Sequence, residues 1–215
     1  LTAFANGSCI DISDQMVLSI TKSPTAYAGP DDEICESETY VLSNSSASSY
    51  SSLSWTTNGD GSFDNPALLH PVYTPGSNDI DGGSVTLTLR SSANGSCTDA
   101  TDEMLLTITL QANAYAGPDA EICEGNTYTT STAIASHFDY LEWTTSGSGS
   151  FNDENILEAV YTPSLSDILN GSVILTITAY ADGSCTDVSD DMNLIISPQA
   201  QAYAGVDAAI CETDT

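Results

Sequence analysis

The chain has 215 residues, of which 30 are Asp or Glu and only Lys22 and Arg90 are basic, so its formal net charge is −28. This charge disfavours binding to nucleic acid or to an anionic membrane surface, because both depend on Lys and Arg. Acidic chains with few apolar residues are often disordered, but here 40% of the residues are hydrophobic and occur in ordered patterns. The composition therefore indicates folded modules that do not recognise phosphate groups.

A repeat organises the sequence. AYAGPDDEICE begins at Ala26, AYAGPDAEICE at Ala114 and AYAGVDAAICE at Ala202, which gives a period of 88 residues. Such a period is too long for a solenoid coil of roughly 20–50 residues and suits an independent domain. We expect the C-terminal part of a preceding repeat at residues 1–24, complete repeats at 25–112 and 113–200, and the start of a following repeat at 201–215.

Residue 1 falls in the middle of a repeat and residue 215 just inside another. The sequence has no initiator Met, no signal peptide and no apolar run near 18 residues. We interpret the chain as a window from a much longer protein, whose targeting and anchoring segments lie outside it.

Each repeat contains a series of short strand signals and no convincing helical period. An extended lead-in at Thr25–Gly29 ends at a Gly-Pro-Asp turn, and the sequence NGDG at Asn58–Gly61 indicates a tight turn. The alternating segments SVTLTLRS and EMLLTITL are typical of half-buried strands. Strands are expected near residues 39–43, 53–57, 62–63, 72–74, 84–91 and 103–110. This pattern predicts an all-β fold, a sandwich of two antiparallel sheets in each repeat.

The large aromatic residues lie among these strand signals, so we interpret them as core residues: Trp55, Phe63 and Tyr73, with Trp143, Phe151 and Tyr161 as counterparts. An exposed sugar-stacking platform is the alternative. The two histidines, His70 and His137, do not align between the repeats and have no repeated Ser or Cys nucleophile pattern nearby. We therefore predict no catalytic residue and expect that the chain is not an enzyme.

The order AxAGPD, IC-E, LxWTT, GSF, VYTP, SVxLT and GSC, followed by an acidic loop and a final strand, resembles a family of bacterial surface repeats. These are the immunoglobulin-like or PKD-like modules of very long Bacteroidota cell-surface adhesins, including the adhesins of gliding bacteria that the type IX secretion system exports. The resemblance implies tandem β-sandwich domains in a linear array, an extracellular, cell-surface location and a role as a stalk or fibre. It transfers no catalytic or ligand-binding residue.

Each repeat carries two cysteines at equivalent positions, Cys35 and Cys97 in one and Cys123 and Cys185 in the other, while Cys9 and Cys211 would pair outside the window. Such position-locked pairs indicate a disulfide framework and an oxidising compartment. We predict the within-repeat bonds Cys35–Cys97 and Cys123–Cys185. A bond between neighbouring repeats, such as Cys35–Cys185, stays open, because in a standard immunoglobulin strand order the first cysteine can fall at the opposite end from the last hairpin loop. A zinc site is not expected, because no CxxC pair or nearby His completes one.

Aspartates recur at two fixed places in the acidic loops. The calcium candidates are Asp99, Asp102, Asp187 and Asp190, with Asp11 and Asp14 at the same places and Asp31, Asp32, Glu33, Asp119 and Glu121 as further residues that could join. Ca²⁺ takes 6–8 oxygen ligands, so a loop with several carboxylates can bind it. The alternative is a solvated acidic loop that keeps strand edges apart and the fibre soluble.

The combined expectation is a structural stalk of a giant adhesin or filament that mediates extension from the cell and surface attachment or gliding. Its expected partners are neighbouring repeats of the same chain, and beyond them self-association into a fibre or an extracellular surface or polysaccharide. Three alternatives stay open: weak carbohydrate-binding modules that act by avidity, spacer domains of a secreted polysaccharide-degrading enzyme, and a fibre that polymerises by strand donation.

Overall fold

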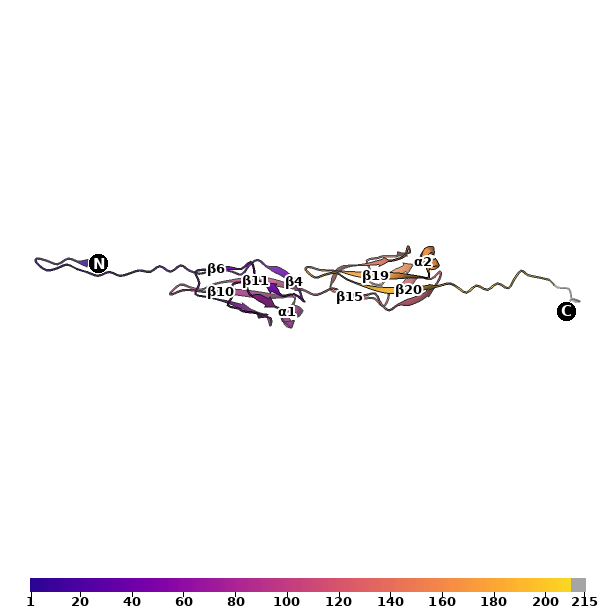
Figure 1. Cartoon of the computed structure of the whole chain (residues 1–215), viewed down its shortest axis with the longest axis horizontal. Helices are drawn as coiled ribbons and strands as arrows, with labels where there is room; N and C mark the ends of the chain where they lie inside the picture. Colours follow the sequence, from indigo (N-terminus) through magenta and orange to yellow (C-terminus); the bar gives the residue numbers. More distant parts are fainter. Residues whose placement is uncertain (210–215) are drawn as a thin grey trace. The chain divides into compact units, whose positions relative to one another are not determined.

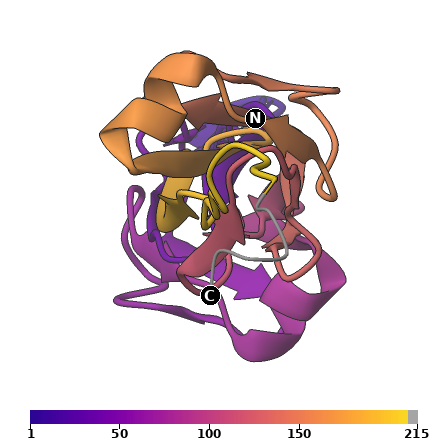
Figure 2. The same cartoon turned by 90° about the vertical axis from the view of Figure 1, so that its right-hand side faces the viewer.

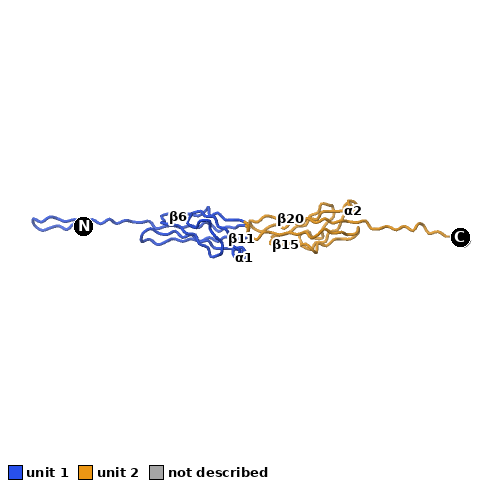
Figure 3. The backbone as a smooth tube through the Cα atoms, turned by 60° about the horizontal axis from the view of Figure 1, so that its bottom comes forward, with its two compact units in different colours: residues 1–34, 38–108 blue, residues 35–37, 109–215 orange. Residues whose placement is uncertain are grey.

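The computed structural model describes residues 1–209 and is all-β, with 44% strand and 6% helix. The chain divides into two compact units, one of residues 1–34 and 38–108 and the other of residues 35–37 and those from 109 onward (Figure 3). Residues 35–37 therefore belong to the first repeat in sequence but to the second unit in space. Over residues 1–209, no helix is long and apolar enough to cross a membrane.

The first unit is a sandwich with its main strands in two layers (Figure 1). One sheet has the order β4–β11–β10–β7, formed by β4 (Asp32–Cys35), β7 (Ser52–Thr57), β10 (Ser84–Ser92) and β11 (Ala100–Thr109). The other layer contains β5 (Tyr40–Val41), β8 (Ser62–Phe63) and β9 (Val72–Thr74) in the order β5–β9–β8, and the pair β3 (Thr25–Tyr27) and β6 (Ser46–Ser48). In the N-terminal segment, β1 (Thr2–Ala3) pairs with β2 (Ile12–Ser13).

The second unit has the same plan. Its larger sheet has the order β13–β20–β19–β16, formed by β13 (Ala120–Cys123), β16 (Phe138–Thr145), β19 (Ser172–Ala181) and β20 (Val188–Ser197). The remaining strands are β14 (Tyr128–Thr129), β17 (Ser150–Phe151) and β18 (Val160–Thr162) in the order β14–β18–β17, and the pair β12 (Asn113–Tyr115) and β15 (Ile134–Ser136).

The prediction of a β-sandwich is confirmed. The sequence predicts sheets that are entirely antiparallel, however, and β13 departs from that expectation. β13 pairs with β20 in parallel, with Cys123 opposite Ser197. The cause is a crossing of the chain between sheets. After β12 the backbone passes Gly117, whose φ of 100° favours glycine, and continues in the other sheet as β13. This strand carries the first cysteine of the repeat, so its direction decides where that cysteine lies.

The core of each unit follows the alternation in the sequence. β10 buries Val85, Leu87 and Leu89, and β11 buries Met104, Leu106 and Ile108 against them. The expected core aromatics are confirmed, since Trp55, Tyr73, Trp143 and Tyr161 are all buried, and Phe63 and Phe151 pack against them. Their burial removes the sugar-stacking alternative for these particular residues.

Two short helices depart from the expectation of strands alone. α1 (Ser77–Gly82) and α2 (Leu165–Asn170) lie at the outer margin of their own units, where Figure 2 shows them as single coils in magenta and orange. Each ends at a glycine with positive φ, Gly83 or Gly171, which accommodates the left-handed conformation of a helix C-cap. Each helix also presents one buried aspartate, Asp79 or Asp167.

Candidate functional site: a disulfide between successive repeats

A disulfide joins Cys35 to Cys185, two residues that lie 150 positions apart in different sequence repeats. Their Cα atoms are 4.8 Å apart. Cys35 is the last residue of β4, and Cys185 lies in the loop between β19 and β20. Both residues belong to the second compact unit, because residues 35–37 are part of it.

Hydrogen bonds hold the segment around Cys35 in place within the second unit. The Glu36 amide donates to the Thr109 carbonyl at 2.9 Å, and the Gln111 amide donates to Glu36 Oε1 at 3.1 Å. The Thr109 carbonyl also lies 3.3 Å from Cys185 Sγ. One carbonyl therefore contacts both sides of the cross-link.

Gln111 covers the disulfide from the side. Its Oε1 lies 3.5 Å from Cys35 Sγ, and its Nε2 donates to the Thr186 carbonyl at 2.5 Å. Cys35 is only 3% exposed. Because thiol–disulfide exchange requires a thiolate to reach a sulfur atom, this cover restricts attack at Cys35, whereas Cys185 is partly exposed.

The predicted pairs Cys35–Cys97 and Cys123–Cys185 are wrong, because Cys35 bonds Cys185. For the second pair, the parallel strand explains why. The register of β13 places Cys123 beside Ser197 at the end of β20, whereas Cys185 precedes the first residue of that strand. Twelve residues of extended chain span about 40 Å, far more than the roughly 7 Å limit between the Cα atoms of a disulfide. Within residues 1–209, Cys9, Cys97 and Cys123 are not disulfide-bonded, and Cys211 lies outside the described residues.

The aspartates at the first fixed place of the acidic loops close the hairpins that contain them. Asp187 Oδ1 accepts a hydrogen bond from the Ala181 amide at 2.9 Å, and Asp99 Oδ1 accepts one from the Ala93 amide at 2.8 Å. Asp99 also pairs with the Arg90 guanidinium. The Ala93 amide first, and then Arg90, lower the pKa of Asp99 below its ordinary value.

The aspartates at the second fixed place bind the lead-in of their own repeat. Asp102 Oδ2 accepts from the Ala28 amide, and Asp190 Oδ2 accepts from the Ala116 amide, both at 2.8 Å. The aspartate of the AGPD sequence makes the reciprocal contact: Asp119 Oδ1 accepts from the Asn193 amide at 2.8 Å, as Asp31 Oδ1 does from Leu105. The repeated AYAGPD sequence is therefore fixed to the last hairpin by two carboxylates in each repeat.

Calcium binding by these acidic loops stays a prediction. Within the described residues, no three His, Cys, Asp or Glu side chains come together as a group that could hold a metal ion. Asp99, Asp102, Asp187 and Asp190 each accept a backbone hydrogen bond instead, so their recurrence has a structural explanation.

A buried carboxylate forms a second polar site in each unit, and the sequence analysis does not predict it. Asp79 Oδ2 accepts hydrogen bonds from the Tyr73 hydroxyl at 2.6 Å and from the amides of Gly61 and Gly76 at 3.0 Å. In the second unit, Asp167 accepts hydrogen bonds from the Tyr161 hydroxyl at 2.8 Å and from the amides of Ser148 and Ser164 at 2.9 and 2.8 Å.

These hydrogen bonds keep the buried aspartates ionised. Burial by itself raises the pKa of Asp167, but the donors from Ser148, Ser164 and Tyr161 outweigh it and lower the pKa to about 2. The pKa of Asp79 is also lowered by its donors, against the effect of burial. Burial, together with the hydrogen bond to Asp79, raises the pKa of Tyr73 to about 12. The arrangement is a structural anchor for the loop and the helix.

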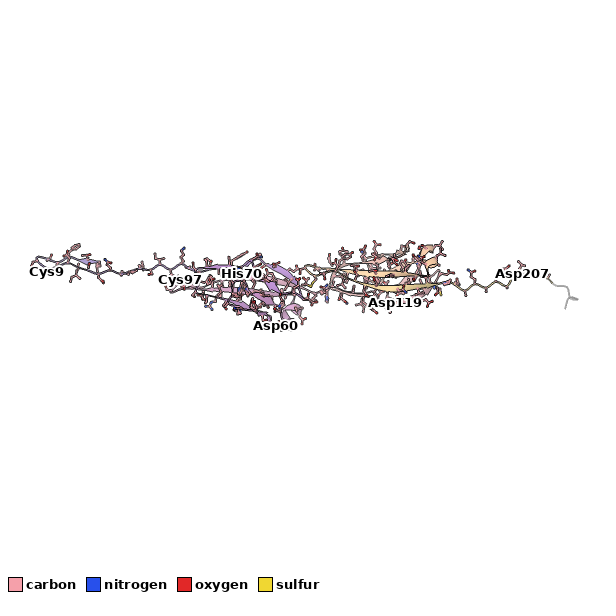
Figure 4. The ribbon with its side chains drawn as sticks, viewed as in Figure 1. Cys9, Asp60, His70, Cys97, Asp119 and Asp207 are labelled. Atoms are coloured by element: carbon pink, nitrogen blue, oxygen red, sulfur yellow. A yellow bond between two sulfur atoms is a disulfide. The ribbon has the colours of Figure 1, made fainter. Side chains whose placement is uncertain are left out.

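The histidines make no repeated constellation. His70 Nδ1 lies 2.9 Å from the Leu42 carbonyl and 3.2 Å from Ser45 Oγ, so it bridges two loops of the first unit. His137 is exposed at a backbone position with φ of 55°. Figure 4 labels His70 on the first unit, together with Asp60 and Cys97.

Comparison with known proteins supports the fold. No protein-family model matches the sequence, and no curated protein sequence matches it. Among solved structures, immunoglobulin domains 1–4 of Sidekick-1 match with a TM-score of 0.50 at 15% identity, over 83% of this chain and 51% of that chain. Domains 1–5 of Sidekick-1 match with a TM-score of 0.50 at 16% identity, over 83% of this chain and 40% of that chain. The chain thus spans about half the length of the first of these structures and has an immunoglobulin-like fold.

Proposed function

We propose that residues 25–112 and 113–200 are structural repeats in the stalk of a very long extracellular adhesin. The repetition of a whole domain supports this role, because each added copy lengthens the protein without new chemistry. A disulfide favours an oxidising compartment outside the cytosol. The sequence motifs favour a cell-surface adhesin of the Bacteroidota type, used for surface attachment or gliding.

The Cys35–Cys185 bond is the observation that carries the proposal. Successive repeats are connected once by the main chain and a second time by this disulfide. When the two ends of the chain are pulled, the force passes across the disulfide, and the residues between the cysteines cannot be extended. Such a cross-link suits a stalk that must resist extension under tension.

Single-molecule stretching of the whole chain from its two ends tests this role. The closed loop covers a sequence separation of 150 residues. At about 3.3–3.6 Å for each extended residue, the oxidised chain should reach a final length roughly 500 Å shorter than the reduced chain. Cys185→Ser in the absence of reductant should extend as far as the reduced protein, whereas Cys97→Ser should behave like the oxidised wild type. Equal final lengths for oxidised and reduced protein would remove the mechanical role.

The charge fits the same function. All modules carry a strong negative charge, so neighbouring stalks repel each other and resist lateral association. In physiological salt this repulsion acts over a screening length of roughly 8–10 Å. We therefore propose neighbouring repeats of the same chain as the main partners, with an extracellular surface or polysaccharide bound elsewhere in the parent protein. No catalytic role is proposed for the chain.

A binding role has one observation in its favour. Tyr140 and Tyr180 stack on each other in the second unit with ring centroids 4.2 Å apart and an interplanar angle of 12°, and Tyr140 is 49% exposed. The equivalent residues of the first repeat are Ser52 and Ser92, so this pair is not needed for the fold. Aromatic faces of this kind can stack on sugar rings. Retention of the chain on immobilised polysaccharides, lost in Tyr140→Ser and kept in Tyr27→Ser, would favour the binding role.

A further inference from the structure

Two cysteines occupy the same places as the bonded pair but carry no disulfide among residues 1–209. Cys97 lies in a GSC loop before the last strand of its repeat, as Cys185 does, and Cys123 ends its EIC strand, as Cys35 does. Cys123 is exposed and Cys97 is partly exposed. Figure 4 shows Cys97 at the end of the first unit where the N-terminal segment enters.

The surroundings of Cys97 reproduce one half of the formed cross-link. Its Sγ donates to the Thr21 carbonyl at 3.5 Å, and the Thr109 carbonyl lies 3.3 Å from Cys185 Sγ. Thr21 and Thr109 occupy equivalent positions one repeat apart. The loop around Cys97 thus has the same local contact as the loop around Cys185, which bonds the first cysteine of another repeat.

The surroundings of Cys123 reproduce the other half. The Glu124 amide donates to the Ser197 carbonyl at 2.8 Å, just as the Glu36 amide donates to Thr109 at 2.9 Å. Ser197 and Thr109 again occupy equivalent positions. Cys123 is therefore held at the end of its sheet in the position from which Cys35 reaches Cys185.

The segment beside Thr21 indicates what binds at Cys97. Residues 15–21, QMVLSIT, correspond to residues 103–109, EMLLTIT. Met104, Leu106 and Ile108 are buried in the first unit, whereas their counterparts Met16, Leu18 and Ile20 are 84%, 77% and 90% exposed. A partner that covers these side chains and brings a cysteine to Cys97 has the properties of another copy of the repeat, with its EIC strand beside residues 15–21.

We propose that the cross-link recurs from repeat to repeat: Cys97 bonds the first cysteine of a preceding copy, and Cys123 bonds the second cysteine of a following copy. The bond forms by exchange with a small disulfide such as oxidised glutathione. One protein thiolate attacks it and releases one glutathione thiolate, and the second protein thiolate then attacks the protein sulfur of the mixed disulfide and releases the other. One protein disulfide is gained and one small disulfide is reduced to two thiols.

This proposal deepens the stalk function and rests on it. Each link spans 150 residues while the repeat is 88 residues long, so consecutive links overlap along the sequence. A repeat inside such a series is enclosed by more than one closed loop. Tension is then carried mainly across disulfides, and only the main chain between successive links, such as that from Cys97 to Cys123, can be extended by pulling.

The test uses the full chain with a copy of residues 26–88 added directly before Leu1, which corresponds to Leu89 and so completes a preceding repeat. The copy carries Ser37→Thr, so that its cysteine peptide differs in mass from those of Cys35 and Cys123. The protein is folded with oxidised and reduced glutathione and cleaved after Tyr, Phe and Leu without reduction. Its linked peptides are identified by mass spectrometry. The copied Cys35 is expected to bond Cys97, and Cys97 should lose its reactivity toward iodoacetamide. In the matched control, with Ser in place of the copied cysteine, Cys97 should stay reactive.

The original Cys35–Cys185 bond serves as the internal reference for correct folding. If this bond forms while the copied cysteine bonds Cys9 or remains a thiol, the proposal is overturned. The connectivity is read without any applied force. A correct connectivity in a chain whose units unfold at the same force before and after reduction would therefore reject the stalk function and leave the recurring cross-link standing.

Discussion

The hydroxyl of Tyr161 donates a 2.8 Å hydrogen bond to the carboxylate of Asp167, which is completely buried at the first turn of α2. Tyr73 and Asp79 form the same pair at 2.6 Å in the first unit. A buried carboxylate is tolerated only when its oxygens are hydrogen-bonded. The glycine-containing turn, the VYTP strand and the short helix of each repeat therefore form one interdependent group.

Tyr161→Phe is expected to destabilise the second unit by about 1.5–3 kcal/mol, because it removes a donor from a buried, charged acceptor. Hydrogen exchange of the β18 and β19 amides measures this loss in the second unit alone. Tyr140→Phe is the matched control, since Tyr140 is half exposed and keeps its ring contact with Tyr180. Equal exchange rates in the two variants would contradict the role of the buried pair.

Acid should weaken the second unit through Asp167. Its pKa is about 2 in the folded protein and about 3.9 in an unfolded chain, so the unfolded state binds the proton first. The stabilisation is complete above the unfolded pKa, and it is lost as the pH falls toward the folded pKa. We expect the urea midpoint of the second unit to fall between roughly pH 5 and pH 2, and to fall less in Asp167→Asn. Comparing the wild type with Asp167→Asn cancels the general effect of protonating the other acidic residues. If the urea midpoints of the two proteins fall in parallel with pH, Asp167 is not the cause.

Gly59→Ala is expected to destabilise the first unit by about 1–3 kcal/mol, as overpacking of a filled site does. A Cβ at this position would lie 1.6 Å from Asp79 Oδ1, so the turn could no longer approach the carboxylate. Gly82→Ala, whose Cβ would enter open space at the end of α1, should be neutral or stabilising. The melting temperatures of both variants, measured by calorimetry, test this prediction. A Gly59→Ala protein as stable as the wild type would show that the turn does not need to approach the Asp79 carboxylate closely.

Calcium should change the melting temperature little. Each repeated aspartate of the acidic loops already accepts a backbone hydrogen bond, which occupies one of its carboxylate oxygens. We expect melting curves of the oxidised chain in Ca²⁺, in Mg²⁺ and in EGTA to agree within a few degrees. A large rise with Ca²⁺ alone would establish the metal site that the spacing of Asp99 and Asp102 suggests.

The strands could be predicted because their signals are local. Val72–Thr74 is expected from VYT followed by Pro75, and the alternation of Val85, Leu87 and Leu89 identifies the buried face of β10. The two helices could not be predicted from the hydrophobic pattern, because a six-residue helix is too short to show a helical period. In the second repeat a usable signal exists, since Ser164, Asp167 and Gly171 have the spacing of a helix cap at each end.

The cysteine pairing could not be derived from the sequence because it depends on a long-range choice. Whether Cys123 lies near Cys185 or about 40 Å from it is decided by the direction in which β13 joins β20. Likewise, the role of Asp102 became evident only from its contact with the Ala28 amide, 74 positions away.

The most direct measurement is the disulfide map of the oxidised 215-residue chain, obtained by cleavage after Tyr, Phe and Leu without reduction and by labelling of the remaining thiols. This cleavage gives peptides of different mass for Cys35 and Cys123. The account predicts a linked peptide pair that contains Cys35 and Cys185, with Cys97 and Cys123 labelled as thiols. A map with Cys35 bonded to Cys97, and Cys123 bonded to Cys185, would contradict the cross-link between repeats and with it the proposed mechanical role.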